Sequence, residues 1–431
     1  MSPELMAAIL MVGFLVLLVI GAEMYVAMGL ASLVGLVFFI HKPLQQLAWS
    51  SWDQMNSFAL TAVPLFVFMG ALFANTGVAR SIFIGAEKLL SGLPGSLFHT
   101  VIGANALFGA MCGSSIAAAA AFTTICFAPL EERGYDPKLA LGTIAVGGTL
   151  SSLIPPSILL IVYGGWWRVS VVHLFAAALI PGILITLLLM VTIVILIKIS
   201  PNLAPPVVKS TWGEKLVALR DLLPWLILIV LILGVIFAGI MTPTEAAALG
   251  AFMAIIFALL YRRMSFKALK VSALGATKTT AMITLILVTA SVLGYVFQAL
   301  GATDAVATLI MKAPFGKAGI LFSLVFMYLI LGCFISSMTM MMITFPFVMP
   351  IIEVLNFSPV WWGVTFVILA EIGMVTPPFG LNLFVVHSEV RKYSILAVSQ
   401  GALPFLVPLM VGVILLIIFP QISLWLPGLL F

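Results

Sequence analysis

Two polar motifs interrupt an otherwise apolar sequence, and each motif occurs twice. They are the serine pairs Ser114-Ser115 and Ser336-Ser337, and the proline pairs Pro155-Pro156 and Pro377-Pro378. Proline removes a backbone donor and clashes with the preceding turn, so two in succession unwind a helix locally. The carbonyl oxygens freed in this way, with hydroxyl groups nearby, are ligands that suit a hard cation such as sodium. The motifs therefore predict two cation sites.

The spacing of the motifs indicates an internal repeat. Both pairs are separated by the same offset of 222 positions (336 − 114 and 377 − 155). The same offset relates Pro137 to Pro359 and Glu23 to Glu245, and rare residues are informative here because Leu and Ala recur by chance. We predict two copies of one unit, residues 1–200 and 221–431, joined by a cytoplasmic linker at 201–220. On architectural grounds the copies are predicted to have inverted topology.

The composition excludes a soluble protein. The chain has 431 residues, of which 63% are hydrophobic and 8% are charged. Apolar stretches recur from Leu5 to Leu426, which predicts an all-α polytopic membrane protein with about eleven transmembrane helices of about 20 residues each. Basic residues cluster around the linker and again after residue 261, and we predict both clusters to be cytoplasmic. They flank spans instead of forming a folded basic domain, which argues against a nucleic-acid partner.

The serine pairs lie in segments typical of re-entrant hairpins. Residues 95–130 are long for one span and short for two, and residues 332–350 repeat the pattern. A hairpin tip opposite an unwound helix would complete an oxygen cage in each repeat. The alternative is structural, because serine in membrane helices often bonds to its own helix or packs at small-residue interfaces. Each proline pair could likewise be a structural kink, with the freed carbonyl oxygens accepting hydrogen bonds from neighbouring hydroxyl groups.

Glu371 is the one carboxylate inside an apolar run, WWGVTFVILAEIGMV. A carboxylate within the membrane is costly and by default indicates a functional site. Its counterpart in the repeat is Thr149, so no symmetric carboxylate pair supports a proton relay. We predict a supporting role near the second cation site, with a buried structural glutamate as the alternative. Glu245 has a local explanation, because Thr242, Pro243 and Glu245 form the pattern of a helix capping box.

Enzyme chemistry finds no support in the sequence. The four histidines are isolated, and no metal-binding spacing, Ser/His/Asp grouping or nucleotide fingerprint is present. We therefore predict that the protein is not an enzyme and has no organic cofactor. Its energy source would be an ion gradient or a partner protein.

The aromatic pair Trp361-Trp362 is predicted to anchor a span end at the lipid–water interface.

At these motifs the chain resembles the large membrane subunit of tripartite ATP-independent periplasmic (TRAP) transporters, the DctM type. The resemblance covers nearly the whole chain. It rests on five blocks: GSSIAAAA, PLxxRGYD at 129–136, GGTLSSLIPPSILLIVYG at 147–164, GIMTPTEAAALG at 239–250 and EIGMVTPPFGLNLFVV at 371–386. Ser336 departs from the family pattern, since many members carry an aspartate there. This implies a different acid as substrate, or a site more symmetric with Ser114.

The resemblance implies sodium-coupled uptake of an organic acid: a C4-dicarboxylate, sialic acid, keto acid or sugar acid. It implies an elevator-type mechanism, as in the ion transporter superfamily, in which hairpins and broken helices move against a fixed scaffold. It also implies three partners besides membrane lipid: the substrate, a periplasmic substrate-binding protein and a small four-helix membrane subunit. The location would be the bacterial inner membrane.

Carried onto this sequence, the resemblance implies two sodium sites with a substrate site between them. Sodium site 1 would be formed by Ser114, Ser115, Ser151, Ile154 and Pro155. Sodium site 2 would be formed by Ser336, Ser337, Gly373 and Thr376. The predicted substrate contacts are Ser152, Glu371 and Asn382.

Two alternative functions remain open. The first is a self-sufficient organic anion permease coupled to protons through Glu371, which would not depend on a binding protein. The second is a membrane enzyme or assembly factor without transport. It predicts no ion-dependent stability and no alternating exposure of Ser114 or Ser336.

Overall fold

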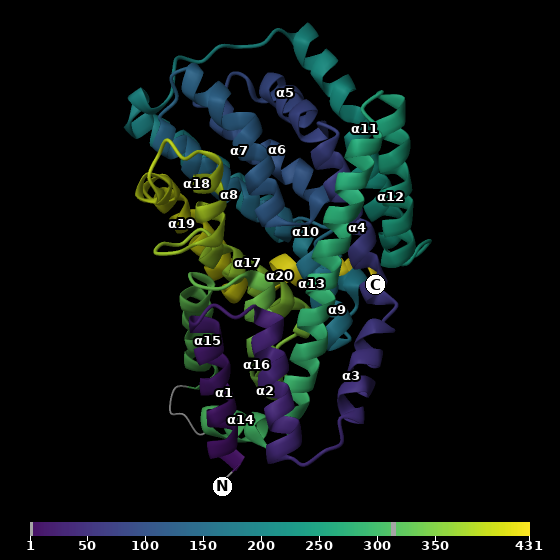
Figure 1. Cartoon of the computed structure of the whole chain (residues 1–431). Coiled ribbons are helices and arrows are strands. Elements are labelled where there is room, and N and C mark those ends of the chain that lie inside the picture. Colours follow the sequence, from purple (N-terminus) through teal and green to yellow (C-terminus); the bar gives the residue numbers. More distant parts are fainter. Residues whose placement is uncertain (1–2, 312–315) are drawn as a thin grey trace.

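The computed structural model describes residues 3–311 and 316–431, and within these ranges the regular structure is helical, without a strand (Figure 1). By length and composition, seven helices of the described chain can cross a membrane. The number is eight if Gln45–Met55 and Ala59–Asn75, bent by 63°, form one span. The all-α polytopic class is therefore confirmed, while the count of eleven spans stays a prediction.

The helical elements fall into two runs along the chain. The first run is α1 (Pro3–Val19), α2 (Met24–Val34), η1 (Gly35–Phe39), α3 (Gln45–Met55), η2 (Ala59–Thr61), α4 (Ala62–Asn75), α5 (Val78–Leu90), α6 (Ser96–Cys112), α7 (Ser115–Glu132), α8 (Pro137–Leu153), α9 (Ile158–Trp167) and α10 (Val171–Ile199). The second run is η3 (Pro201–Leu203), α11 (Trp212–Phe237), α12 (Pro243–Leu260), α13 (Phe266–Ala299), α14 (Ala302–Met311), α15 (Gly316–Gly332), α16 (Ser337–Val354), α17 (Pro359–Met374), α18 (Leu381–Glu389), α19 (Ile395–Ile418) and α20 (Gln421–Leu430).

Several helix starts are separated by the offset found in the sequence. Helices α7 and α16 start 222 positions apart (337 − 115), and so do α8 and α17 (359 − 137). For α8 and α17 the cause is local, because Pro137 and Pro359 each occupy a first helical position, where a missing N–H costs nothing. Asp136 and Ser358 cap these two helices. The division into residues 1–200 and 221–431 stays a prediction.

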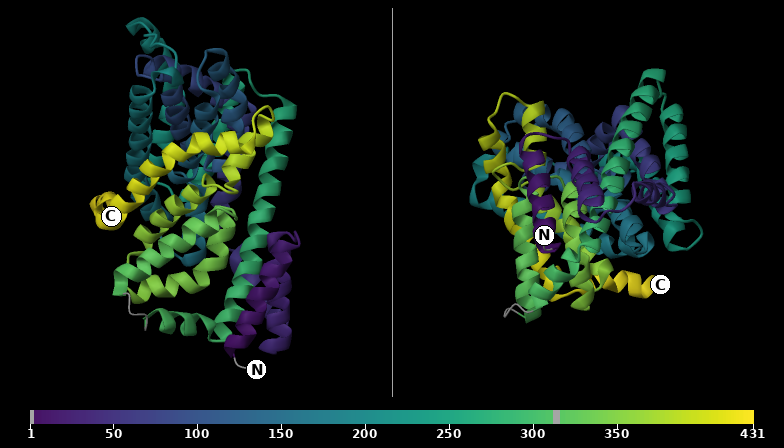
Figure 2. Two further views of the ribbon diagram at one scale, coloured as in Figure 1. Left: turned by 90° about the vertical axis from the view of Figure 1, so that its left-hand side faces the viewer. Right: turned by 60° about the horizontal axis from the view of Figure 1, so that its bottom comes forward.

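The two helical hairpins occupy opposite ends of the molecule. In Figure 1 the α6–α7 hairpin lies in the upper half and the α15–α16 hairpin in the lower half, and Figure 2 shows the same separation from the side. Each hairpin folds back at a short tip, residues 113–114 in the first and 333–336 in the second. Residues of both tips line one cavity.

The two broken helices differ in how deeply their breaks are buried. The segment Pro137–Trp167, which contains the break between α8 and α9, is the most enclosed of the candidate spans, with 94% of its apolar window buried. Every residue of α17 from Trp361 to Met374 is buried as well. Irregular backbone at membrane depth is tolerated only inside protein or along a cavity. The first break meets that condition, since Pro155 and Pro156 are buried, whereas at the second break Pro377 is half-buried and Pro378 is exposed.

The capping prediction for Glu245 is confirmed. The Thr242 hydroxyl accepts a hydrogen bond from the Glu245 amide at 3.3 Å, and the Glu245 carboxylate accepts one from the Thr242 amide at 2.8 Å. Glu245 therefore caps the N-terminal end of α12, whereas Glu23, its counterpart in the repeat, precedes α2 without a side-chain capping hydrogen bond.

Residues 212–220 of the predicted linker form the first turns of α11, because Thr211 and Glu214 make a reciprocal capping box there. The linker as the boundary between the two copies stays a prediction. One other sequence prediction is wrong. Trp361 and Trp362 are not interface anchors, since they are 2% and 0% exposed. The Trp361 indole N–H donates to the Leu416 carbonyl of α19 at 2.9 Å, and the Trp362 ring lies 5.9 Å from the Tyr328 ring of α15, so the two residues pack in the core against two neighbours of α17.

Candidate functional site

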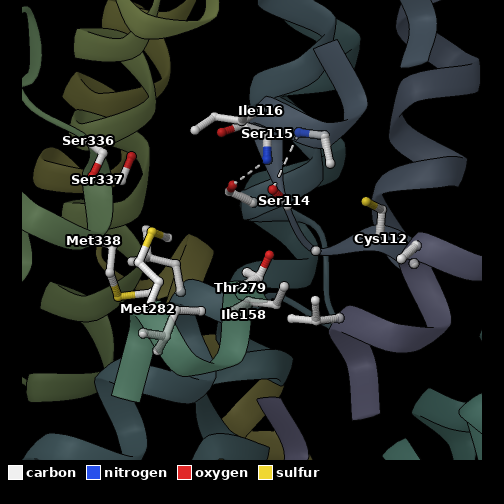
Figure 3. A pocket seen from close by; sticks show the side chains of 18 of the residues that line it. Cys112, Ser114, Ser115, Ile116, Ile158, Thr279, Met282, Ser336, Ser337 and Met338 are labelled. Atoms are coloured by element: carbon white, nitrogen blue, oxygen red, sulfur yellow. Dashed lines mark hydrogen bonds between the residues drawn. The ribbon is translucent and has the colours of Figure 1, made fainter. Parts of the chain in front are cut away.

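A cavity of about 300 Å³ lies where the two hairpin tips meet (Figure 3). Both predicted serine pairs line it, and so do two of the predicted substrate contacts. These lining residues are Ser114, Ser115, Ser336, Ser337, Ser152 and Glu371. The fold thus brings together polar residues that are up to 257 positions apart in the sequence (371 − 114).

The first tip is held against the first helix break by backbone contacts. Gly113 ends α6 in the left-handed conformation, at φ 65°. A side chain there would collide with the Pro156 carbonyl oxygen, since a Cβ would lie 2.9 Å from it. The Ile158 amide, which starts α9, donates to the Gly113 carbonyl at 3.4 Å, and the Ser115 amide donates to the Ser152 hydroxyl at 3.1 Å.

The second tip meets the second helix break in the same way. The Gly380 amide, directly before α18, donates to the Cys333 carbonyl of the tip at 3.1 Å. Gly380 and Ile158 are themselves separated by 222 positions (380 − 158). The backbones also cross closely, because a Cβ on Gly332 would lie 2.8 Å from the Gly373 Cα. Small residues at such crossings are the usual means by which membrane helices approach.

Two helix N-termini point into the cavity. Ser114 caps α7, where its hydroxyl accepts from the Ala117 amide at 3.5 Å, and Ser336 caps α16, where its hydroxyl accepts from the Thr339 amide at 3.3 Å. The unsatisfied amides of a helix N-terminus carry partial positive charge, which favours a negatively charged group. The cavity therefore has a positive electrostatic contribution from the backbone of both hairpins.

Glu371 joins the two hairpins. It is 3% exposed, and its Oε1 accepts a hydrogen bond from the Ser337 hydroxyl at 3.1 Å. Ser115 and Ser152, from α7 and α8, also lie close enough to interact with its carboxyl group. Its Oε2 has no hydrogen-bond partner among the described residues. A buried acceptor left open in this way calls for a ligand, an ion, a water molecule or a proton.

The other predicted site residues do not line the cavity. They are Ser151, Ile154, Pro155, Gly373, Thr376 and Asn382. The Ser151 hydroxyl donates to the Asn105 carbonyl at 3.5 Å, and the Thr376 hydroxyl donates to the Ile372 carbonyl at 2.6 Å. Asn382 is fully buried, and its amide donates to the Ala145 carbonyl at 3.3 Å. These residues therefore lie outside the lining of the cavity, in or next to the two helix breaks.

One wall of the cavity was missed in the sequence. Helix α13 contributes Gly275, Thr279, Met282 and Ile283, and α4 contributes Val67, Gly70, Ala71 and Ala74. The α13 residues recur at helical spacing, so they share one face. A signal existed in the sequence, because residues 277–280 of this helix read TKTT, a run of four consecutive polar residues.

Comparisons with known proteins agree with this architecture. The sequence model of the family "Tripartite ATP-independent periplasmic transporter, DctM component" matches residues 11–422. The chain is 33% identical over 403 residues to the C4-dicarboxylate TRAP transporter large permease protein DctM of Pseudomonas aeruginosa, a match covering 93% of this chain and 94% of that protein. It is 33% identical over 378 residues to the sialic acid TRAP transporter permease protein SiaT of Haemophilus influenzae, covering 87% and 61%.

A solved structure shares the fold. The crystal structure of the Alcanivorax borkumensis YdaH transporter matches with a TM-score of 0.63 at 16% identity, over 90% of each chain. Together, the match over residues 11–422, the full-length relatives and the membrane-spanning helices show that this chain is a multi-pass membrane protein belonging to the DctM family of TRAP transporter large permeases.

Proposed function

We propose that the chain is the large permease subunit of a sodium-coupled importer of an organic acid in the bacterial inner membrane. It would receive its substrate from a periplasmic binding protein and work beside a small membrane subunit, with no enzymatic reaction and no organic cofactor. The observation that carries the proposal is the convergence of two serine tips and two broken helices around one cavity. Helices broken at membrane depth are how secondary transporters build ion and substrate sites.

The ligand chemistry supports sodium. Each tip and break offers hydroxyl and carbonyl oxygens, and no soft ligand is needed. Buried acceptor oxygens without a donor among the described residues occur beside each predicted site: Asn105 Oδ1, Asn382 Oδ1 and Glu371 Oε2. The backbone carbonyl of Asn105 accepts from Ser151 of site 1, and Glu371 accepts from Ser337 of site 2. A bound cation would be a better partner for these acceptor oxygens than another side chain with several hydrogen-bond donors.

The electrostatics support an anionic substrate. The N-termini of α7 and α16 direct partial positive charge into the cavity, and sodium ions at the tips would add to it. The relatives named above are a C4-dicarboxylate permease and a sialic acid permease, and both named substrates are organic acids.

The arrangement of the walls supports an elevator mechanism. One side of the cavity is built by the hairpins and broken helices, and the other by α4 and α13. Helix α13 packs on α2, α3 and α4, whereas α8 packs on α6, α7 and α19. A cavity between two such groups allows one to slide past the other with its ligands.

The first test is the melting temperature of the purified protein, with its small subunit, in sodium chloride against equimolar potassium and choline chloride. A ligand that binds the folded state alone stabilises it by about 2.7 kcal/mol at about a hundredfold excess over Kd. We expect the melting temperature to be higher in sodium chloride than in potassium or choline chloride. The double variant Ser114→Leu/Ser336→Leu should lose the rise, because the larger side chains fill the tips.

Ser323→Leu is the matched control, since Ser323 lies on the second hairpin but is exposed and away from the cavity. It should keep the sodium response. A folded protein that responds equally to all three salts would contradict sodium coupling. Uptake that then follows a pH gradient would favour the proton-coupled permease, and uptake without any binding protein would favour a self-sufficient one.

A further inference from the structure

We propose that the substrate of this permease is a monocarboxylate with an apolar body, such as a branched-chain 2-oxo acid. The inference rests on the proposed function, and it narrows the class of organic acid. It follows from where the polar groups, the apolar groups and the charges lie in the cavity.

The cavity has a polar end and an apolar end. Hydroxyl groups are concentrated at the two serine tips, with Ser152 of α8 and Thr279 of α13 as the further hydroxyls among the described lining residues. The rest of the wall is apolar, and includes Val67, Ile158, Leu159, Met282, Ile283 and Met338. In the view of Figure 3, Met282, Met338 and Ile158 lie below the labelled serines. A substrate with one charged end and one apolar end matches this division.

The polar end suits one carboxylate. The N-termini of α7 and α16 meet there, and their open amides favour an anionic group. We place the substrate carboxylate between Ser114 and Ser336, where both helix ends act on it. The apolar body then extends toward α4, α9 and α13.

A second carboxylate would have no partner. None of the described residues lining the cavity is a lysine or an arginine, and the one charged side chain is Glu371. Among the basic residues on the described helices that line the cavity, Lys278 of α13 comes closest, because it is next in sequence to the lining residue Thr279. The others, Lys138, Lys267 and Lys270, lie in the first turns of their helices. Even a rearranged lysine would supply one charge, so a second carboxylate that extends away from the tips and their sodium ions would be buried without a cationic partner among the lining side chains.

A polyhydroxylated acid would also be disfavoured. Its hydroxyl groups would face methionine, isoleucine and valine side chains, which cannot replace the hydrogen bonds lost from water. Each buried hydroxyl without a partner is expected to lower affinity about tenfold. Methionine side chains, by contrast, adapt to irregular apolar groups, so the wall tolerates branched chains of different shape.

The test is a titration of the purified permease, with its small subunit and in sodium chloride, by melting temperature. The probes are 4-methyl-2-oxopentanoate, succinate, N-acetylneuraminate and gluconate. We expect the 2-oxo acid to bind with a Kd at least about tenfold lower than the other three. Tighter binding of succinate or of either sugar acid would overturn the inference, and so would binding of none of the four while the sodium response is kept. Loss of the sodium response itself would instead contradict the proposed function.

A charge swap provides a second readout that a folding defect cannot imitate. Met282→Arg places a cation on the apolar wall, and we expect it to improve succinate binding at least about tenfold and to weaken the 2-oxo acid. Thr277→Arg is the matched control, because Thr277 is on the same helix, exposed and outside the cavity. If both arginine variants keep the sodium response and the wild-type order of ligands, the apolar wall does not select the substrate.

Discussion

Replacing Gly373 with alanine is expected to abolish both the sodium-dependent rise in melting temperature and uptake. A Cβ at this position would lie 2.4 Å from the Gly332 Cα and 2.6 Å from its carbonyl carbon. Both are backbone atoms, so no side chain can turn away to make room, and α15 must separate from α17. Overpacking of this kind costs about 1–3 kcal/mol or more. The separation also moves the second tip, where the Cys333 carbonyl accepts a hydrogen bond from the Gly380 amide.

The matched control is Gly234→Ala on α11, where an added Cβ meets nothing within 4 Å. Alanine in an open helical position should be neutral or slightly stabilising, by up to about 1 kcal/mol. Melting curves of both variants in sodium and in choline separate the effect on folding from the effect on the ion. A Gly373→Ala protein with a normal sodium response would show that the contact between the second tip and α17 does not build the site.

Replacing Glu371 with glutamine is expected to raise the sodium concentration needed for half-maximal stabilisation at least about tenfold. The carbonyl of glutamine can still accept from the Ser337 hydroxyl, so the change removes charge but keeps that contact. A full charge about 5 Å from a cation, at an effective dielectric constant of about 20, contributes up to about 3 kcal/mol. The measurement is a sodium titration of melting temperature, followed by uptake driven either by a sodium gradient or by a pH gradient.

Glu389→Gln controls for loss of one negative charge, because Glu389 is exposed at the end of α18 and does not line the cavity. It should leave the sodium titration unchanged. If Glu371→Gln leaves sodium affinity intact and eliminates uptake driven by a pH gradient, then Glu371 carries a proton. That result would favour the proton-coupled alternative over a sodium-supporting role.

Local sequence rules predicted much of this architecture. The composition gave the membrane class, the proline pairs marked the two breaks, and the threonine and glutamate three positions apart marked the start of α12. The breaks and the helix start depend on residues within one or two helical turns, and the membrane class depends on composition and on apolar runs of about 20 residues. The same rule would have placed the start of α11 at residue 212, had the Thr211–Glu214 pattern been recognised. The burial of Trp361 was not predictable in this way, because its partner Leu416 is on another helix.

The sequence by itself determined that this is a polytopic membrane protein with two serine tips and two broken helices, because composition and backbone breaks are properties of short segments. Tertiary structure alone decided which groups share the cavity. It brought Glu371 to Ser115 and Ser152 of the other half, added α4 and α13 as the apolar wall, and placed Asn382 behind α8. These relations depend on how helices far apart in the chain pack against one another, and no local pattern carries that information.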